Sequence, residues 1–528
     1  MADSSRPNII LILADDMGYS DIGSYGSEIR TPNLDGMADT GLRFSQMYNY
    51  ARCCPSRATL LTGISPHRAG IGHMVSDLGV PGYRGFLNDE CVTVAEALKL
   101  AGYRTLMSGK WHVGGEYDLQ RPESWTPGDI CHPTPRQRGF DEFFGTLTGA
   151  GSYFNPLTLY RNETPETPDS PDFYYTDAIA DNAVSMIDKA ADGDAPFFLY
   201  TAFTSPHWPL HALEEEIARY EGRYRSGWDT LRTGRHEELR DSGILEQKWD
   251  ITPRDASAPP WESVEDTDWE DLRMAAYAAQ IDRMDQGIGR ILAALDRHGI
   301  AGNTLVMFLS DNGGCAEFLA EDTGKPEPSK FDTPTLDGSK MQFGNVPGLR
   351  PGPGNTFMSY DLPWSNASNT PFRLYKHWVH EGGISTPFIV RWPEKIKAAA
   401  IVHEPAQLMD ITATCLDAAG VAYPREHNGV EIAPLEGESL MPIIEGREGR
   451  RQMPIFWEHE GNRAVRQGEW KLVSKFPGEW EIYNMTEDRT ELMNLADGER
   501  DRVAAMSRQY AEWAERARVA QWPVRAKS

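Results

Sequence analysis

The chain has 528 residues, of which 40% are hydrophobic and 25% are charged, and its formal net charge is −26. This length favours two domains over one, and the composition is that of an ordinary globular protein. The negative charge argues against nucleic acid and anionic membranes as partners, because the surface as a whole repels both. The six cysteines show no repeated C-x-x-C spacing, so the sequence suggests neither a disulfide framework nor a zinc site.

The N-terminal residues 1–6 precede a short apolar run from Ile9 to Ala14. Six apolar residues are too few for the hydrophobic region of a signal peptide, and no small-residue cleavage site follows. No stretch of the chain approaches the length of a transmembrane helix. We therefore expect a cytoplasmic protein. A chain that had lost its leader would have the same sequence and would be periplasmic or secreted.

Four apolar runs indicate strands, and helical segments lie between them. One helical segment carries an apolar stripe at 3–4 spacing from Ile281 to Leu295, and another follows Thr93. Alternating strands and helices predict an α/β domain with a large, mostly parallel sheet sandwiched by helices. The four predicted strands span residues 7–16, 196–203, 304–312 and 387–392.

The rest of the chain suggests loops and a second domain. A charged stretch at 213–270 is interpreted as a surface excursion, and a Gly-, Pro- and Asn-rich stretch at 316–372 as loops that could shape a pocket. Past residue 400, segments 463–474 and 479–484 alternate as antiparallel strands do, and an amphipathic helix is expected at 499–519. We predict a catalytic α/β domain at 1–400 and a smaller C-terminal α+β domain at 401–528.

Two pairs of oxygen-bearing side chains follow predicted strands: Asp15-Asp16 and Asp311-Asn312. The carboxyl ends of parallel strands are where ligands gather in such sheets. Oxygen ligands without Cys or His select Ca²⁺, with Mg²⁺ possible, rather than zinc. An isolated Asp-Asp pair is more often a helix cap or a solvated turn, so the cation site depends on the two pairs meeting in the fold.

The most informative segment is residues 53–63, with the sequence C-C-P-S-R-A-T-L-L-T-G. It resembles the signature of the type I sulfatases, C-x-P-S-R followed by three residues and L-T-G. The resemblance implies an alkaline phosphatase-like fold and oxidation of Cys53 to formylglycine by a separate maturase. The hydrated aldehyde would attack the sulfur of a sulfate ester and then expel sulfate. An isolated C-x-P would more often be structural, and Cys54 departs from the small or polar residues commoner there.

Further segments resemble the same family, in particular bacterial arylsulfatase-type enzymes. Residues 8–16 and 309–313 are similar to the metal motifs of sulfatases, in which the cation, usually calcium, also holds the formylglycine oxygen. Position 53 is therefore expected to join the metal ligands. Residues 464–472 and 494–496 are similar to the C-terminal pattern of the family, so the match extends from about residue 6 to about residue 518.

The resemblance also assigns roles to basic side chains. Arg57 would hold the hydrated formylglycine, Lys110 would bind a sulfate oxygen, and His112 would act as the general base that releases sulfate. His207 and Lys376 would face the leaving-group oxygen. A lone residue of either kind is usually structural or solvated. A basic group of this size in a chain of net charge −26 favours a site for a small anion.

The sulfated substrate, an aryl or a carbohydrate sulfate, is not fixed by the sequence. His73 and Trp208 are candidate substrate-binding residues, and a packing role is an equal alternative for both. Two other functions stay open. One is a phosphonate or phosphate ester hydrolase of the same superfamily, in which Tyr and Thr tend to replace the residues found here at Lys110 and His112. The other is a non-catalytic protein that binds sulfated glycans.

Overall fold

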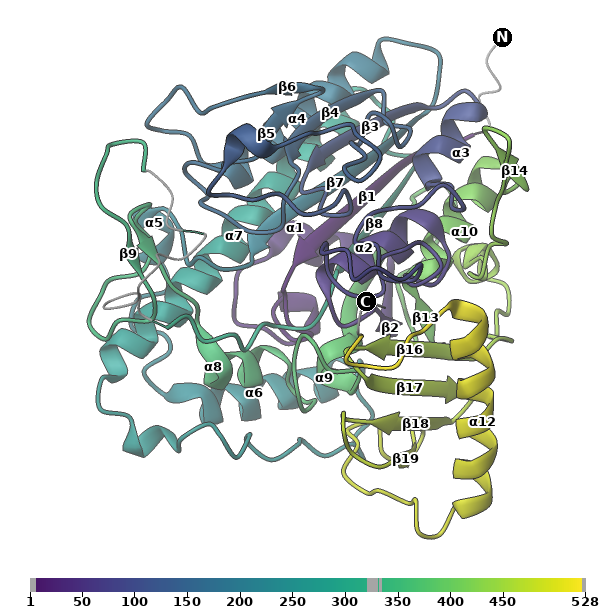
Figure 1. Ribbon diagram of the computed structural model, residues 1–528. Helices are drawn as coiled ribbons and strands as arrows, with labels where there is room; N and C mark the ends of the chain where they lie inside the picture. The colour runs from purple at the N-terminus through teal and green to yellow at the C-terminus, as the bar shows by residue number, and fades with distance from the viewer. Residues whose placement is uncertain (1–5, 321–330, 332–334, 525–528) are drawn as a thin grey trace.

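A mixed sheet of eleven strands forms the centre of the computed structural model, which describes residues 6–320, 331 and 335–524 (Figure 1). The strand order is β12-β2-β11-β8-β1-β7-β3-β4-β5-β6, and β13 also pairs with β2. The five strands from β8 to β4 are parallel. The strands are β1 Asn8–Asp15, β2 Leu42–Tyr48, β3 Arg104–Gly109, β4 Glu142–Thr146, β5 Leu159–Arg161, β6 Thr164–Pro165, β7 Phe197–Pro206, β8 Thr304–Ser310, β11 Ser385–Arg391, β12 Ala400–Val402 and β13 Ala406–Gln407.

The central strand β1 explains why the predicted strands are continuous apolar runs. Ile10 and Ile12 point into one hydrophobic cluster, while Ile9 and Leu11 point into another on the opposite face. A strand that is covered on both faces needs apolar residues at every position. The predicted α/β fold, with a large, mostly parallel sheet between helices, is confirmed. The run at 387–392 forms β11, but this strand is antiparallel to both β8 and β2.

Two layers of helices cover the sheet, as Figure 1 shows. The first layer contains α1 Pro32–Asp39, α4 Tyr175–Ala191, α5 Glu214–Ile217, α6 Gly227–Asp241, α7 Thr267–Arg297 and α8 Asp361–Ser368. The second contains α2 Cys53–Thr62, α3 Val94–Leu100, α10 Leu408–Ala419 and α11 Met441–Ile444. The predicted helices correspond to α7 and α3. Helix α3 begins with a capping box between Thr93 and Glu96, which satisfies two backbone N–H groups.

The stretch at 213–270 is not the surface excursion that its charge suggested. It contains α5 and α6, and its aromatic residues Tyr220 and Trp228 are buried in the first layer. The turn at residues 222–224 is also fixed, because the Asp271 carboxylate accepts hydrogen bonds from the backbone N–H groups of Gly222 and Tyr224. The charged residues lie on the outside of a packed segment. The average hydrophobic content of the stretch does not reveal this packing.

A second, antiparallel sheet carries helix α12 on one face, at the lower right of Figure 1. The predicted strands and terminal helix correspond to elements of this unit. Past the predicted boundary at residue 400, β12, β13 and α10 still join the large sheet and its layers. The elements are β16 Ile455–His459, β17 Asn462–Gln467, β18 Trp470–Ser474, β19 Glu481–Asn484 and α12 Arg500–Ala517.

Short elements complete the described chain, and part of the loop-rich stretch at 316–372 lies outside the described residues. No helix in the described residues is long and apolar enough to cross a membrane. The short elements are β9 Gln342–Phe343, β10 Thr356–Phe357, β14 Glu426–His427, β15 Val430–Glu431, α9 Glu381–Ile384, and the 3₁₀ turns Gly23–Tyr25, Pro122–Ser124 and Trp261–Ser263.

Candidate active site

Four parallel strands bring the predicted site residues to one edge of the large sheet. Asp15 ends β1, Lys110 follows β3, His207 follows β7, and Asp311 follows β8. These strands are neighbours in the order β8-β1-β7-β3, so their carboxyl ends meet. Asp16 turns the chain away from β1 with a φ of 65°, a left-handed conformation that Asp tolerates better than most residues.

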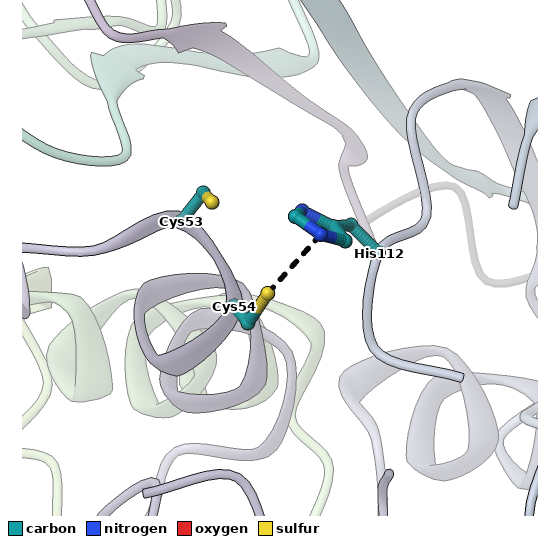
Figure 2. Close-up of side chains that lie close together, drawn as sticks. All are labelled: Cys53, Cys54 and His112. Carbon is teal, nitrogen blue, oxygen red and sulfur yellow. Dashed lines mark hydrogen bonds between the residues drawn. The ribbon is translucent and has the colours of Figure 1, made fainter. Parts of the chain in front are cut away.

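Cys53 is the first residue of α2 and faces the same edge. Arg52 before it has extended backbone angles, and Pro55 sits in the first helical turn, where its missing N–H has no helical partner to lose. The side chains of Cys53, Cys54 and His112 approach one another within 4.8 Å (Figure 2). Cys54 Sγ lies 3.3 Å from His112 Nε2, and Cys53 is 1% exposed.

The two thiols differ in acidity because each acts on the other. A hydrogen bond with Cys54 and the positive charge of Lys110 lower the pKa of Cys53 well below its usual value, against the opposing effect of burial. Burial and the neighbouring Cys53 raise the pKa of Cys54 well above its usual value. Cys53 is therefore the thiol whose ionised form this site stabilises.

The four oxygen-bearing side chains do meet in the fold, and all are buried. Asn312 Nδ2 donates to Asp16 Oδ1 over 2.7 Å, and the backbone N–H of Asp16 donates to Asp311 Oδ1 over 3.3 Å. Asp15 Oδ1 and Asn312 Oδ1 have no hydrogen-bond partner among the described residues, although both are buried. Buried acceptors without donors are costly unless a ligand serves them. The donor set of carboxylate and amide oxygens therefore fits a hard divalent cation.

Two of the predicted basic residues, Lys110 and Arg57, lie against these acidic groups. Lys110 Nζ is 2.5 Å from Asp15 Oδ2, and Arg57 Nη2 is 2.8 Å from Asp311 Oδ2. Arg57 Nη1 also donates to the backbone carbonyl of Lys110 over 3.0 Å. The sequence predicted an excess of positive charge in the site. The carboxylates in the site offset the charge of the basic side chains.

Lys376 and His207 form the other side of the site. Lys376 Nζ lies 2.8 Å from Asp16 Oδ2 and 3.4 Å from His207 Nε2. His207 Nδ1 lies 2.6 Å from the backbone carbonyl of Trp208, so this nitrogen carries the proton and Nε2 keeps its lone pair. The ring of His207 is thereby oriented toward Asp16 and Lys376.

Burial dominates the titration of the site. It raises the pKa of Asp311 to about 8, with the nearby charge of Asp15 adding to the effect and Arg57 opposing it. Burial also lowers the pKa of both His112 and His207 to about 4. Burial would raise the pKa of Asp16, but the charge of Lys376, and that of His207 when it is protonated, lower it. Both histidines are therefore neutral at pH 7 and can accept a proton.

A cavity of about 230 Å³ opens onto Cys53, His112, His207 and Lys376. Trp208, a predicted substrate-binding residue, is part of its wall. His73, the other one, is not a lining residue, and its Nε2 lies 3.0 Å from Glu460 Oε1 in a neighbouring cluster. The cavity is lined by Arg52, Cys53, Met74, Val75, His112, Gly115, Glu116, Tyr117, Leu119, Thr148, Gly149, Ala150, His207, Trp208, Glu317, Phe331 and Lys376.

Three charged residues of the cavity wall, Arg52, Glu116 and Glu317, were not predicted from the sequence. Glu317 accepts from Arg52 Nη1 over 2.8 Å and from Trp208 Nε1 over 2.9 Å. The charges of Lys376 and Arg52 lower the pKa of Glu317, against burial, so it is ionised. Arg52 could have been found from its position directly before Cys53. Glu317 sits in a loop-rich stretch, where no local pattern marks it.

Comparison with known proteins identifies relatives over most of the chain. The family model described as "Sulfatase" matches residues 7–421, and the one described as "N-sulphoglucosamine sulphohydrolase, C-terminal" matches residues 372–513. The arylsulfatase of Klebsiella aerogenes is 36% identical over 86% of this chain and 95% of its own length. An uncharacterized sulfatase of Schizosaccharomyces pombe is 33% identical over 94% of this chain and 91% of its own.

Solved structures share the fold. Ps i-CgsB in complex with k-i-k-neocarrahexaose has a TM-score of 0.66 and 25% identity, covering 96% of this chain and 93% of that one. A protein solved with its substrate D-glucosamine-2-N,6-O-disulfate has a TM-score of 0.62 and 20% identity, covering 99% and 100%.

Proposed function

The chain belongs to the sulfatase family and hydrolyses sulfate esters, and from this premise we propose that its nucleophile is a formylglycine made from Cys53 and that a divalent cation assists it. The observation that carries the proposal is the position of Cys53. Its sulfur lies within 4.8 Å of a ring nitrogen of His112, at a cavity that also reaches Lys376 and His207. A nucleophile beside a neutral imidazole is the arrangement that covalent catalysis uses.

The cation would be held by Asp15, Asp16, Asp311 and Asn312, together with the side-chain oxygen at position 53. When bound, Ca²⁺ or Mg²⁺ would stabilise negative charge on the reacting oxygens. The unpartnered buried oxygens of Asp15 and Asn312 support this assignment. The lysines paired with Asp15 and Asp16 would share these carboxylates with the cation.

The modified residue would supply a hydrated aldehyde, of which one hydroxyl attacks sulfur and the other permits sulfate to be expelled. Arg57 is fixed by Asp311 and by the carbonyl of Lys110, so its guanidinium can position the residue one helical turn away at 53. Lys110 would attract a sulfate oxygen. His112, neutral above a pKa of about 4, would accept the proton of the second hydroxyl at its ring nitrogen.

The leaving group would depart on the side of Lys376 and His207. Their nitrogens lie 3.4 Å apart, so one alkoxide oxygen can contact both, and Lys376 carries the proton that an alkoxide needs. Trp208 and Phe331 form an aromatic part of the cavity wall, with ring centroids 5.2 Å apart. This wall offers a stacking surface for the ring of an aryl sulfate, in keeping with the activity named for the Klebsiella relative, and equally for the ring of a carbohydrate sulfate.

The direct test is peptide mass spectrometry of the segment that contains residue 53, combined with turnover of nitrophenyl sulfate. Oxidation of Cys53 to formylglycine lowers the mass by about 18 Da, and only converted protein should release sulfate. Turnover by fully unconverted protein would contradict the proposal. Purification with and without co-expressed maturase provides the matched pair, since the maturase is the partner that the proposal requires.

The alternatives predict different kinetics. A phosphonate or phosphate ester hydrolase would prefer a nitrophenyl phosphonate, and a tenfold preference would overturn the proposed specificity. A glycan-binding protein would bind without turnover even when residue 53 carries the aldehyde. The sulfatase relatives favour neither alternative. A cytoplasmic location and the absence of nucleic-acid and membrane partners stay predictions from the sequence.

A further inference from the structure

A second cluster of ionisable side chains lies beside the catalytic cavity and has no part in the proposed reaction. It consists of His73, His377, His459 and Glu460, hereafter the histidine cluster. The residues come from three distant segments: the loop after α2, the loop before α9, and the hairpin between β16 and β17. We propose that the histidine cluster binds a divalent transition-metal ion of the zinc class, which ties the small sheet to the large one.

The distances within the cluster suit such an ion. Glu460 Oε1 lies 3.0 Å from His73 Nε2 and 3.7 Å from His459 Nε2, and Glu460 Oε2 lies 3.1 Å from His377 Nδ1. One ligand atom from each of His377, His459 and Glu460 lies within 4.8 Å of the others. Ligands about 2.0–2.1 Å from an ion are roughly 3.3 Å apart in a tetrahedron, so small movements would complete a His₃Glu set.

His459 supplies an independent reason to expect a ligand. Its side chain is fully buried, yet neither ring nitrogen has a hydrogen-bond partner among the described residues. A neutral imidazole carries one donor and one acceptor, and burying both without partners is costly. The carboxylate of Glu460 lies 3.7 Å from His459 Nε2, which is too long for a hydrogen bond. An ion between them would bind the lone pair of His459.

The backbone conformation at Glu460 is unusual for a glutamate. Glu460 and Gly461 form the two-residue turn of the β16–β17 hairpin, and both have positive φ angles, 50° and 80°. Asn, Asp and Gly are preferred at the first position of such a turn, and Glu is disfavoured there. His377 also has a positive φ, 95°. Two of the four cluster residues therefore hold backbone conformations that a purely structural role would fill with other residues.

The surroundings permit an ion to enter and to be retained. The side chains of His73, His377 and Glu460 are 21–29% exposed, whereas the indole of Trp522 lies 5.0 Å from the ring of His73 and partly covers it. The positive charge of Arg52 is close to the cluster but is paired with Glu317. Glu458, which holds His67 over 2.7 Å, adds negative charge on the other side.

The test uses the full chain, washed with chelator and then held in excess Ca²⁺, so that oxygen-ligand sites are filled. Zn²⁺ binding is measured by calorimetry, and Co²⁺ is added separately to read the visible absorption of tetrahedral cobalt. We expect one Zn²⁺ per chain, a tetrahedral Co²⁺ spectrum, and a rise in Tm with Zn²⁺. His73→Gln and Glu460→Gln, both at partly exposed positions, should each weaken Zn²⁺ binding by about tenfold or more.

The control is His427→Gln. His427 is 22% exposed and lies 3.9 Å from a carboxylate of Glu96, so it resembles His73 in exposure and pairing but stands outside the cluster. It should leave Zn²⁺ binding unchanged. A Cys53→Ala parent that binds no Zn²⁺ in Ca²⁺, or variants of His73 and Glu460 that bind as tightly as this parent, would overturn the proposal. All proteins in this test carry Cys53→Ala, because Cys53, Cys54 and His112 form another group that could hold Zn²⁺.

Discussion

Two of the sites at which the chain buries charged side chains use these charges differently. In the catalytic cluster, Lys110, Arg57 and Lys376 face three aspartates, yet buried oxygens of Asp15 and Asn312 are left without partners. The second place is the inter-sheet network, formed by Tyr48, Glu381, Arg466, Lys471, Arg489 and Glu491 between the large and small sheets.

In the inter-sheet network, opposite groups meet at close range. Lys471 Nζ lies 2.7 Å from Glu381 Oε1 and 2.8 Å from Glu491 Oε1. Glu381 Oε2 accepts hydrogen bonds from Tyr48 and Ser385. The guanidinium of Arg489 also faces aromatic rings, 5.4 Å from the centroid of Tyr19 and 4.8 Å from that of Phe372.

The difference teaches that burial of charge alone does not mark a functional site. Both sites leave buried polar atoms without hydrogen-bond partners among the described residues, but the open acceptor of the inter-sheet network, Glu491 Oε1, lies 2.8 Å from the ammonium of Lys471. Matched opposite charges hold two parts of a fold together, whereas the open oxygens of Asp15 and Asn312 are available to a ligand. Changes in the catalytic cluster should therefore affect turnover more than folding, and changes in the inter-sheet network should do the reverse. Four experiments can break or sharpen this comparison.

The largest effect is expected for Cys53→Ala. Loss of the nucleophile precursor should reduce turnover of nitrophenyl sulfate by about 10⁴-fold or more, because the remaining groups cannot replace covalent catalysis. The Tm should change little, since the variant removes no charge pair. Cys131→Ser, at a half-buried cysteine that does not line the cavity, is the matched control and should keep full activity. A large fall in Tm for Cys53→Ala would contradict the expectation that changes in the catalytic cluster affect turnover more than folding.

The opposite behaviour is expected for Lys471→Met. The substitution leaves Glu381 and Glu491 buried beside an apolar side chain, which should cost about 3–5 kcal/mol in the free energy of unfolding. Turnover per folded molecule should remain, because Lys471 does not reach the cavity. Lys395→Met removes an exposed pair with Glu445 and should cost less than about 1 kcal/mol. Denaturant unfolding measures the loss in the free energy of unfolding for both variants. Equal losses would show that burial does not increase the stabilisation that the network provides.

A smaller catalytic effect is expected for His112→Gln. The glutamine keeps a polar side chain of similar size but cannot accept a proton at neutral pH, so turnover should fall by about 10²–10³-fold. Because sulfate release depends on this base, a burst of released alcohol should precede the slow steady state. His298→Gln, which removes a partly exposed histidine paired with Asp188, should leave both phases unchanged. Loss of the burst together with turnover would place His112 before sulfate release instead.

The smallest effects are those of pH on stability. Burial lowers the pKa of His112, His207 and His211 to about 4 from 6.5, so the folded state binds fewer protons than the unfolded state between these values. Their contribution is complete above pH 6.5 and is lost as the pH falls toward 4. The charges of Lys471 and Arg489 lower the pKa of Glu381 to about 2, against burial, so its contribution is complete above 4.5 and lost toward pH 2.

Denaturant unfolding between pH 7.5 and 3 checks this order. The histidines should lower stability as the pH falls from 6.5 to 4, whereas the raised pKa of Asp311 acts in the opposite direction, so the measured quantity is the difference in slope between wild type and His207→Gln. His207→Gln should remove part of the decline, and the decline due to the inter-sheet network should follow at lower pH. Equal slopes for wild type and His207→Gln between pH 6.5 and 4 would contradict the depressed pKa of His207.

The sequence by itself determined the features that depend on neighbouring residues. Continuous apolar runs predicted β1, β7 and β8, because a strand covered on both faces needs no polar side chain. The segment from Cys53 to Gly63 carried the family resemblance, since its residues act within one helix and its cap. The positions of Asp15, Asp16, Asp311 and Asn312 followed from strand ends, because parallel strands present those ends at one edge.

Only the tertiary structure decided which distant residues meet. It placed His73 with Glu460 rather than in the cavity, brought Glu317 to Arg52, and paired Lys471 with Glu381 across 90 positions. It also turned β11 antiparallel and buried the aromatic residues Tyr220 and Trp228 of the charged stretch at 213–270. Such pairings depend on strand register and on the packing of layers, which the local pattern of a sequence does not encode. The sequence motif therefore determines the local chemistry, whereas the fold determines which distant residues modify it.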